Sequence, residues 1–533
     1  MTTTARTAAP RGPLALPLFR SLWLAQLASG IGGWMQTVAA QWMLVSRPGA
    51  ATWVSLVQAA SLLPMLFVSL PAGVLADVLD RRRLLIAVQV SMAVGAGALA
   101  ALTAAGLTTP ALLIAVTFVL GCGQALGNPA WQAIQPELVP REQIPAAAAL
   151  GSMGVNVARA IGPALAGVLL TVTSTWVLFT LNAVSYLAVV GALLAWRRAE
   201  PADAEPETAA RALRAGARYV RHAPGVRRIL ARAALFVLPA SALWALLPVV
   251  ASDRLHQGSG GYGLLLAALG LGAVLGAALM GRARRILTPS RLVAAASALF
   301  ALGTLGAALM HSLVVVTVLM VPTGLGWLLA LSALNTTMQL SLPAWVRARG
   351  LAVYLVVFMG GQGIGSLLWG LLARPLTTTG ALVLAAALLL LTALTMPLLP
   401  LLPQSGTLDR TPVAAWPEPA LSFLPDHDSG PVLVQVEYRV GDSEAPGFLA
   451  AARHLGTSRR RTGATRWGMF RDTASPDRYL EVFELPSWDE HLRQHHSRTT
   501  GYDQELLDAV RAYATAEPQV RHLMTARPEG NPP

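Results

Sequence analysis

The sequence predicts an all-α polytopic membrane protein with twelve transmembrane helices in two six-helix halves, followed by a small α+β domain. Mean hydropathy is +0.54, and charged residues make up only 13% of the 533 residues, whereas soluble proteins carry about a quarter. No carboxylate occurs between Asp253 and Asp409. Helices in a bilayer favour such a stretch, because a charge at mid-bilayer costs about 2.5–3.5 kcal/mol on insertion scales. From Pro403 onward the composition becomes that of a soluble protein.

Apolar windows of about 20 residues define the expected spans. They begin near residues 18, 51, 84, 109, 145, 174, 229, 259, 290, 312, 349 and 378, and the last ends near residue 402. A polar, Arg-rich segment separates six spans from six, which indicates a duplicated bundle. Transporters are commonly built from such repeats, with the substrate path between them. We therefore expect an N-terminal half at residues 15–196, a cytoplasmic linker at 197–228 containing a membrane-surface helix, and a C-terminal half at 229–402.

The distribution of arginine predicts the orientation in the membrane. The chain contains no lysine, so all 40 basic residues are Arg. With a cytoplasmic N-terminus, most Arg residues outside the spans fall in inner loops, and the outer loops hold only Arg47, Arg254 and Arg374. The positive-inside rule then places both termini in the cytoplasm of a multi-pass protein of the inner, or plasma, membrane.

The net charge of +13 does not indicate a nucleic-acid partner. Residues 403–533 contain 14 Arg and 18 acidic residues, so the positive charge lies in the apolar part and reflects membrane topology. The expected partners are the lipid bilayer and a small-molecule substrate. The single cysteine, Cys122, excludes an intramolecular disulfide.

A dense charge cluster joins the second and third spans. Its residues are Gly73-Val-Leu-Ala-Asp77-Val-Leu-Asp80-Arg81-Arg82-Arg83-Leu-Leu85. Two carboxylates and three guanidinium groups in so short a turn favour contacts with other parts of the protein. The turn resembles the loop between the second and third helices of the major facilitator superfamily. Gly73, Leu75, Asp77, Arg81, Arg82 and Leu85 match that pattern, whereas Val78 and Asp80 depart from it.

A second resemblance lies in the fifth span. Residues 158–167, which contain Gly162 and Pro163, resemble the Gly-Pro motif of the superfamily's exporters. Together with the run from Asn128 to Pro140, they resemble the enterobactin-exporter-like branch, also called transmembrane secretion effectors. The resemblance covers residues 15–402. It implies a secondary active transporter, not an enzyme, that exports a small amphipathic, siderophore-like or drug-like molecule by alternating access and proton coupling. Import of a small solute, or a membrane-tethered sensor or enzyme, remains an alternative.

The resemblance also implies a gate. Asp77 would face the N-terminus of the eleventh span, near Arg349 to Tyr354, where the helix dipole favours a carboxylate. Gly73 and Arg81 would complete this latch between the halves. Alternatively, Arg81 to Arg83 only orient the chain by their charge. Gly162 and Pro163 are expected to bend the fifth span, because proline lacks an N–H; they form either a gate or an ordinary close packing contact.

Polar residues inside the spans are candidates for a substrate cavity. Arg159 lies about 14 residues, or roughly 20 Å, into its helix, and an intramembrane charge is by default a functional candidate. Polar side chains also recur at helical spacing on the spans that line the central cavity of the superfamily; the candidates are Gln124, Asn128, Gln132, Gln36, Asn335 and Gln339. The alternative is that these groups hold helices together, at about 0.6 kcal/mol for each hydrogen bond. No carboxylate lies within a span, so the sequence does not identify a proton carrier.

The polar tail follows a second linker at residues 403–430. Alternating apolar residues and a Ser487–Glu490 capping box predict the order β-α-β-β-α-β over residues 431–528, which is ferredoxin-like. The tail resembles dimeric α/β-barrel domains of the antibiotic-biosynthesis monooxygenase type, which implies self-association or regulation. His491 and His495 have the i, i+4 spacing of a ligand pair, but without an H-E-x-x-H arrangement such a pair is more often a solvated face. We therefore expect no metal, no cofactor and no catalysis.

Overall fold

The computed structural model describes residues 12–196, 209–401, 408–413, 425–426 and 429–525, which form two compact units. The first unit is helical and comprises residues 1–206, 232–334 and 355–400. The second unit comprises residues 207–231, 335–354 and 401–533. The expected linker residues 197–208 and most of 403–430 lie outside the described residues.

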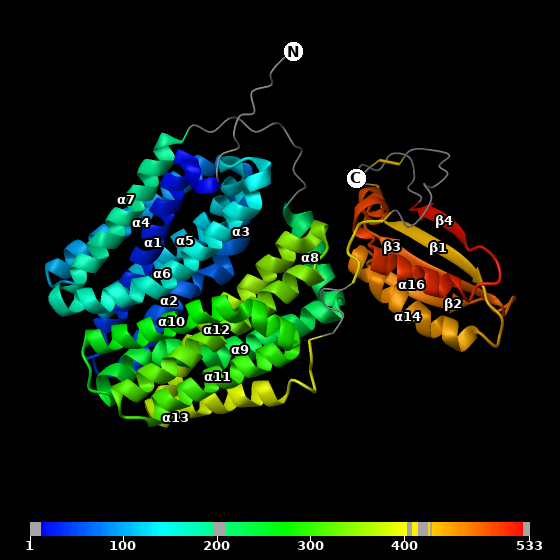
Figure 1. Ribbon diagram of the computed structural model, residues 1–533. Coiled ribbons are helices and arrows are strands. Elements are labelled where there is room, and N and C mark those ends of the chain that lie inside the picture. Colours follow the sequence, from blue (N-terminus) through cyan, green and yellow to red (C-terminus); the bar gives the residue numbers. More distant parts are fainter. Residues whose placement is uncertain (1–11, 197–208, 402–407, 414–424, 427–428, 526–533) are drawn as a thin grey trace, which may run out of the picture. The chain divides into compact units, whose positions relative to one another are not determined.

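The helical unit is built from long helices that begin close to the predicted starts (Figure 1). The N-terminal half contains α1 (Pro17–Trp42), α2 (Ala50–Leu62), α3 (Pro64–Val78), α4 (Arg81–Ala104), α5 (Pro110–Ile134), α6 (Ile144–Val172) and α7 (Thr175–Ala195). The later helices are α9 (Pro224–Val249), α10 (Ser259–Ile286), α11 (Pro289–Leu309), α12 (Leu313–Ser341) and α13 (Ala344–Leu394), of which α9, α12 and α13 extend into the second unit.

Local sequence explains several helix starts. The hydroxyl of Thr109 accepts a hydrogen bond from the backbone N–H of Leu112, and Pro110 occupies the first helical position of α5. Thr288 and Pro289 begin α11 in the same way. A short polar cap followed by proline suits a helix start, because the cap accepts a free backbone N–H and proline has none to satisfy.

Ten helical segments in the described part of the chain are long and apolar enough to cross a membrane. One of them combines α2 and α3 into the span Ala50–Ser69. The expected first span coincides with α1, which is not among the ten. The expected eleventh and twelfth spans both fall within α13, whose 51 residues are interrupted by the non-helical Thr377 (φ 62°, ψ 163°). The protein is therefore a mostly helical, multi-pass membrane protein.

The second unit contains a four-stranded antiparallel sheet in the order β2-β3-β1-β4. Its elements are β1 (Val432–Arg439), α14 (Ala445–Thr462), β2 (Arg466–Arg471), β3 (Arg478–Leu485), α15 (Trp488–Arg493), α16 (Gly501–Arg511) and β4 (Gln519–Met524), together with α8 (Ala209–His222). Alternate residues of β1 and β3 are buried, and Val434 and Phe483 pack against Phe448 of α14 and Leu507 of α16. These elements follow one another along the chain in the expected order.

The helical stretch after β3 is interrupted, whereas the order β-α-β-β-α-β predicts a single helix there. The hydroxyl of Ser487 does accept the N–H of Glu490 at the start of α15. However, α15 ends at Arg493, a π-helical turn covers Gln494–Arg498, and α16 begins only at Gly501. The reason is a second capping box, in which Thr500 and Asp503 satisfy each other's backbone N–H groups.

Candidate functional site

The charged turn between α3 and α4 is fixed by contacts on both sides. Asp80 caps α4, because its Oδ1 accepts the backbone N–H of Arg83 at 2.7 Å. Arg81 pairs with Glu137 at 3.0 Å, after the end of α5. Arg82 donates from Nε and Nη2 to the carbonyl oxygens of Leu193 and Leu194, at 2.8 and 3.0 Å, near the end of α7. The latch contacts predicted for Gly73 and Asp77 fall outside what the structure describes, because the surroundings of these two residues are not among the described ones.

The cap explains why an acid stands at position 80. We expect Asp80→Ala to destabilise the protein by about 1 kcal/mol, because a helix loses an N-cap. Asp80→Asn should retain nearly full stability, because its side-chain oxygen still accepts the N–H. Thermal unfolding of both variants in detergent measures the difference, and equal losses in the two variants would show that the charge, not the cap, matters.

The two halves of the helical unit meet where α6 packs against α10. A Cβ atom at Gly167 would lie 2.4 Å from the Cα atom of Gly263, and a Cβ atom at Gly270 would lie 2.8 Å from the Cα atom of Ala160. Real Cβ atoms essentially never come within 3.0 Å of another heavy atom. The backbones therefore touch over more than one turn, and a side chain at either glycine would separate the halves.

A second contact between the halves joins α2 to α13. The hydroxyl of Thr52 donates to the carbonyl oxygen of Gly370 at 3.0 Å, and Nε of Arg374 donates to the Thr52 hydroxyl at 3.0 Å. Nearby, the Tyr262 hydroxyl of α10 donates to Oε1 of Gln41 in α1 at 2.8 Å. The sequence predicts Arg374 only as an outer-loop residue. Its hydrogen bond to Thr52 in the opposite half is seen only in the structure.

Gly162 and Pro163 serve packing within the N-terminal half. A Cβ atom at Gly162 would lie 2.6 Å from Cβ of Trp34 and 3.0 Å from the carbonyl oxygen of Ile31. Both Gly162 and Pro163 are buried in α6. This geometry fits the packing alternative and leaves a gating role as a prediction.

Arg159 lies beside Trp34, whose ring contacts an aromatic ring of the other half. Its guanidinium carbon lies 5.9 Å from the centroid of the Trp34 ring, and Trp34 lies 6.1 Å from Trp244 of α9. Gln124 and Gln132 are exposed on α5, where Gln132 donates to Asn128 at 3.5 Å. Asn128 is half-buried, and a role of these residues in lining a cavity stays a prediction.

Gln36, Asn335 and Gln339 fit the cavity prediction less directly. Gln36 is buried, and its Oε1 accepts Nδ2 of Asn182 in α7 at 2.5 Å. Gln36 therefore joins α1 to α7 within the N-terminal half through a hydrogen bond. In the second unit, Gln339 donates to Asn335 at 3.4 Å along one face of α12, and Gln339 is exposed.

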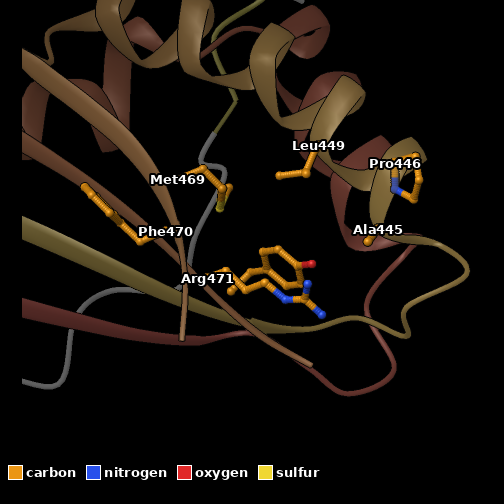
Figure 2. A pocket seen from close by; sticks show the side chains of 7 residues that line it. Ala445, Pro446, Leu449, Met469, Phe470 and Arg471 are labelled. Atoms are coloured by element: carbon orange, nitrogen blue, oxygen red, sulfur yellow. The ribbon is translucent and has the colours of Figure 1, made fainter. Parts of the chain in front are cut away.

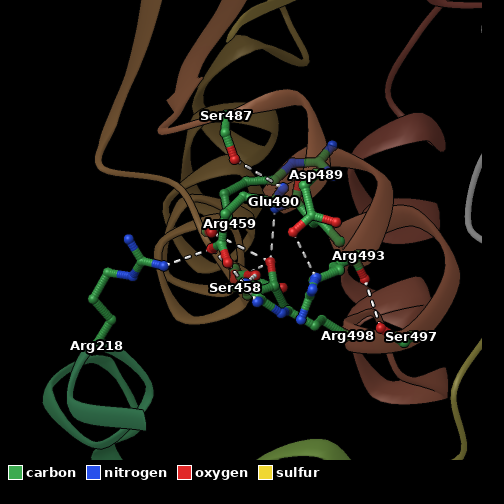
Figure 3. A network of polar contacts seen from close by, with 11 residues as sticks. Arg218, Ser458, Arg459, Ser487, Asp489, Glu490, Arg493, Ser497 and Arg498 are labelled. Carbon is green, nitrogen blue, oxygen red and sulfur yellow. Dashed lines mark hydrogen bonds and ion pairs between the residues drawn. The ribbon is translucent and has the colours of Figure 1, made fainter. Parts of the chain in front are cut away.

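A network of buried charges links α8 to the sheet-containing part of the second unit (Figure 3). Glu490 accepts two hydrogen bonds from Arg498, each of 2.7 Å, and one of 2.7 Å from Arg218 of α8. Burial opposes ionisation of Glu490, but the hydrogen bonds and charges of Arg498 and Arg218 lower the pKa of its carboxyl. Glu490 therefore remains ionised at pH 7. Its hydrogen bond with Arg218 fixes α8 to α15.

Aromatic and cationic side chains extend this contact to α13. Tyr219 of α8 packs edge-on against Trp345 of α13, with ring centroids 5.6 Å apart. Arg461 of α14 lies 5.9 Å from the ring of Tyr219, and Arg498 lies 5.0 Å from the ring of Trp345. The second unit thus combines α8, the start of α13 and the sheet-containing domain.

Three histidines gather beneath the sheet. His491 and His495 come from α15 and the π-helical turn, and His522 comes from β4, opposite Val434 on the inner face. One ring nitrogen from each lies within 4.8 Å of the others. Burial first, and then the other imidazoles and Arg459, lower the pKa of His491 to about 3; burial, His522, Arg459 and His496 lower that of His495 to about 4. Burial also lowers the pKa of the His522 imidazole. A lowered pKa favours the neutral form of each ring at pH 7. The i, i+4 spacing pointed to the first two, whereas His522 could be placed only by the sheet register.

A shallow pocket of about 470 Å³ lies between α14 and the edge of the sheet (Figure 2). Its lining is mostly apolar: Ala445, Pro446, Leu449, Met469, Phe470, Arg471 and Tyr479. Nε of Arg471 donates to the carbonyl oxygen of Pro476, and Arg471 also pairs with Asp442. The pocket therefore offers shape and apolar surface but no acid–base pair for catalysis.

Comparison with curated proteins finds transporters. The chain is 28% identical over 392 residues to the multidrug efflux pump Tap of Mycobacterium tuberculosis, covering 70% of this chain and 88% of the relative. It is 29% identical over 372 residues to the enterobactin exporter EntS of Escherichia coli (68% and 86%). It is 26% identical over 348 residues to the staphyloferrin A transporter of Staphylococcus aureus (64% and 86%).

Solved structures share the fold. A bacterial homologue of the human lysosomal transporter Spinster, in an inward-facing and occupied conformation, matches with a TM-score of 0.58 at 16% identity, over 72% of this chain and 97% of that one. The nucleoside transporter NupG matches with a TM-score of 0.55 at 13% identity, over 72% and 98%. A family model described as transmembrane secretion effector matches residues 8–529. The chain therefore belongs to the transmembrane secretion effector family of major facilitator transporters.

Proposed function

We propose that this protein exports a small amphipathic, drug-like or siderophore-like molecule across the cell membrane by alternating access. The observation that carries the proposal is the contact between the halves at Gly167 and Gly263, where backbones touch without intervening side chains. Such a contact can open and close as the halves rock against each other. A membrane anchor for an enzyme or sensor needs one span and no such interface. The efflux functions of Tap and EntS support export over import.

The proposed topology has twelve spans and cytoplasmic termini. It counts α1 as the first span and divides α13 near Thr377 into the eleventh and twelfth. The domain boundaries proposed are 15–196, 197–228, 229–402, 403–430 and 431–528. Cysteine accessibility in a Cys122→Ala background, with single cysteines at positions 9 and 530, tests both ends. Labelling of either end from outside intact cells contradicts the topology.

Transport in everted membrane vesicles tests the export proposal. Vesicles containing the protein should accumulate dyes, macrolides or siderophores from a substrate panel faster than vesicles lacking it, and an imposed proton gradient should increase the rate. Accumulation only in right-side-out vesicles would indicate import. Absence of transport with every panel member in both orientations, while the purified protein modifies a substrate, would favour the enzyme alternative.

We propose that Arg159, with Gln124, Asn128 and Gln132, contacts the substrate. The ring of Trp34, which lies beside Arg159 and contacts Trp244, supports this placement, because a guanidinium next to an aromatic ring can recognise an anionic or aromatic group. Asn335 and Gln339 would contribute from the other half, and Gln36 would act by supporting α1. Arg159→Gln should raise the half-saturating concentration of an anionic substrate more than that of a cationic dye. Equal effects on both would remove the anion-binding role.

We propose the Asp77 latch as the gate at the cytoplasmic side, with Gly73 and Arg81 beside it. Asp77→Asn should abolish transport without preventing membrane insertion, because an amide loses most of the attraction to a helix N-terminus. Transport in vesicles and protein level in the membrane are measured together. Asp80→Asn is the matched control in the same turn, and full transport by Asp77→Asn would refute the latch.

We propose that the C-terminal part is a ferredoxin-like regulatory domain that self-associates. Its contacts with α8 and Trp345 support regulation, since Trp345 lies at the start of α13, where the latch partner is proposed. The apolar residues Leu433, Leu480 and Val482 alternate with the buried ones on the opposite sheet face, which favours self-association. Light scattering of the full chain in detergent should give a dimer, and Val482→Arg should give a monomer. A monomer for the unmodified chain contradicts self-association.

A further inference from the structure

We propose that His491, His495 and His522 form a binding site for one divalent transition-metal ion, for which Zn²⁺ is the test ion. The three imidazoles come from α15, the π-helical turn that follows it and β4, and they converge on one point. A ring nitrogen of each lies within 4.8 Å of the other two. Imidazole nitrogens bind zinc at about 2.0–2.1 Å, so small side-chain rotations bring them onto a shared ion.

Two of the three imidazoles have buried ring nitrogens that make no hydrogen bond with the described residues. Both ring nitrogens of His491 and Nε2 of His522 are buried without a hydrogen-bond partner among the described residues. His491 and His495 are almost fully buried. Buried polar atoms normally have partners, and exceptions call for an explanation such as an ion. A solvated helix face, the usual alternative for an i, i+4 histidine pair, does not describe them.

The surroundings hold the ligands in place. The ring of Trp488 lies 4.9 Å from that of His491, and the His491 ring lies 4.7 Å from each of the other two imidazoles. The cation Arg459 is paired with Glu481, whose carboxylate accepts its Nε at 3.1 Å and its Nη2 at 3.4 Å. Its charge is therefore largely compensated before an ion binds.

The donor set selects the class of ion. Neutral imidazoles suit zinc, copper, nickel and iron, whereas magnesium and calcium require oxygen ligands. The cluster contains no carboxylate or thiolate among the described residues. Three histidines fill three positions of a tetrahedral ion and leave the fourth for water or another small ligand. The expected site therefore binds one borderline divalent ion with an open position.

The test uses the full-length protein, purified in detergent through a tag without histidine and stripped with a chelator. Titration with Zn²⁺ should give one bound ion per chain. Titration with Co²⁺ should give the visible absorption of a tetrahedral complex. Either no stoichiometric Zn²⁺ binding or an octahedral Co²⁺ spectrum in the unmodified protein overturns the proposal, whatever the variants do.

Variants identify the ligands. His491→Gln and His522→Gln should each weaken Zn²⁺ binding by at least about tenfold, because loss of a ligand exceeds the effect of losing an outer-shell partner. His454→Gln, on the exposed side of α14, is the matched control and should bind as the unmodified protein does. Gel filtration confirms that each variant is folded. Unchanged binding in folded His491→Gln and His522→Gln, or an equal loss in His454→Gln, overturns the site.

Discussion

Replacing Gly263 with leucine is expected to reduce transport severely. A Cβ atom at Gly263 would lie 2.6 Å from Cα of Gly167, and 3.3 and 3.4 Å from the backbone N and C atoms of the same residue. Backbone atoms cannot rotate away as a side chain can, so α6 and α10 must separate. Overpacking of this kind costs about 1–3 kcal/mol. Applied to one of two alternating states, that energy shifts their populations by about 5- to 150-fold.

The variant should insert normally and fail to cycle. Transport is measured in everted vesicles at equal protein level, and crosslinking between cysteines placed on α6 and α10 reports whether the contact still forms. Gly281→Leu is the matched control, because it lies on the same helix and a Cβ atom there meets nothing within 4 Å. Equal transport by Gly263→Leu and Gly281→Leu would show that the α6–α10 contact is not needed for the transport cycle.

The membrane helices follow from the sequence because hydropathy and caps are local properties. The predicted span starts lie close to the helix starts, and Thr109 with Pro110 is a signal that a reader of the sequence can recognise. The role of Asp80 can also be recognised from the local sequence. Asp80 departs from the superfamily pattern. It is nevertheless an ordinary N-cap residue, because its side chain accepts the backbone N–H of Arg83, three residues later.

Contacts between distant segments could not be predicted in the same way. Gly167 ends the segment that resembles the exporters' Gly-Pro motif, but its partner Gly263 lies 96 positions further along the chain, and nothing local marks it. His522 was missed for the same reason, since only the register of β4 against β1 brings it beside His491. The roles of polar residues on helices could not be predicted, because their spacing shows which residues share a helix face but not what that face contacts. Gln36 is an example, since it was a cavity candidate but accepts a hydrogen bond from Asn182.

The largest stability effect is expected for Glu481→Gln in the centre of the sheet. Glu481 is fully buried and accepts hydrogen bonds from Arg459, from the Tyr438 hydroxyl at 3.1 Å and from Trp467 Nε1 at 3.0 Å. An amide cannot balance the guanidinium charge, and its NH₂ group would face other donors. Removing one partner of a buried ion pair costs about 3–5 kcal/mol. Small domains have only about 5–15 kcal/mol in total, so much of the sheet's stability should be lost.

Amide hydrogen exchange in the full-length protein measures this loss strand by strand. In Glu481→Gln, the amides of β1 and β3 should exchange far faster, while those of the membrane helices remain unchanged. Glu484→Gln is the matched control, because it lies on the same strand but points to the other face, where its carboxylate pairs with the exposed Arg466 at 3.8 Å and accepts the Thr465 hydroxyl at 3.4 Å. Such a surface pair contributes about 0–1 kcal/mol. Similar exchange in the two variants would mean that the buried carboxylate does not hold the sheet together, because burial and charge pairing are what distinguish these two positions.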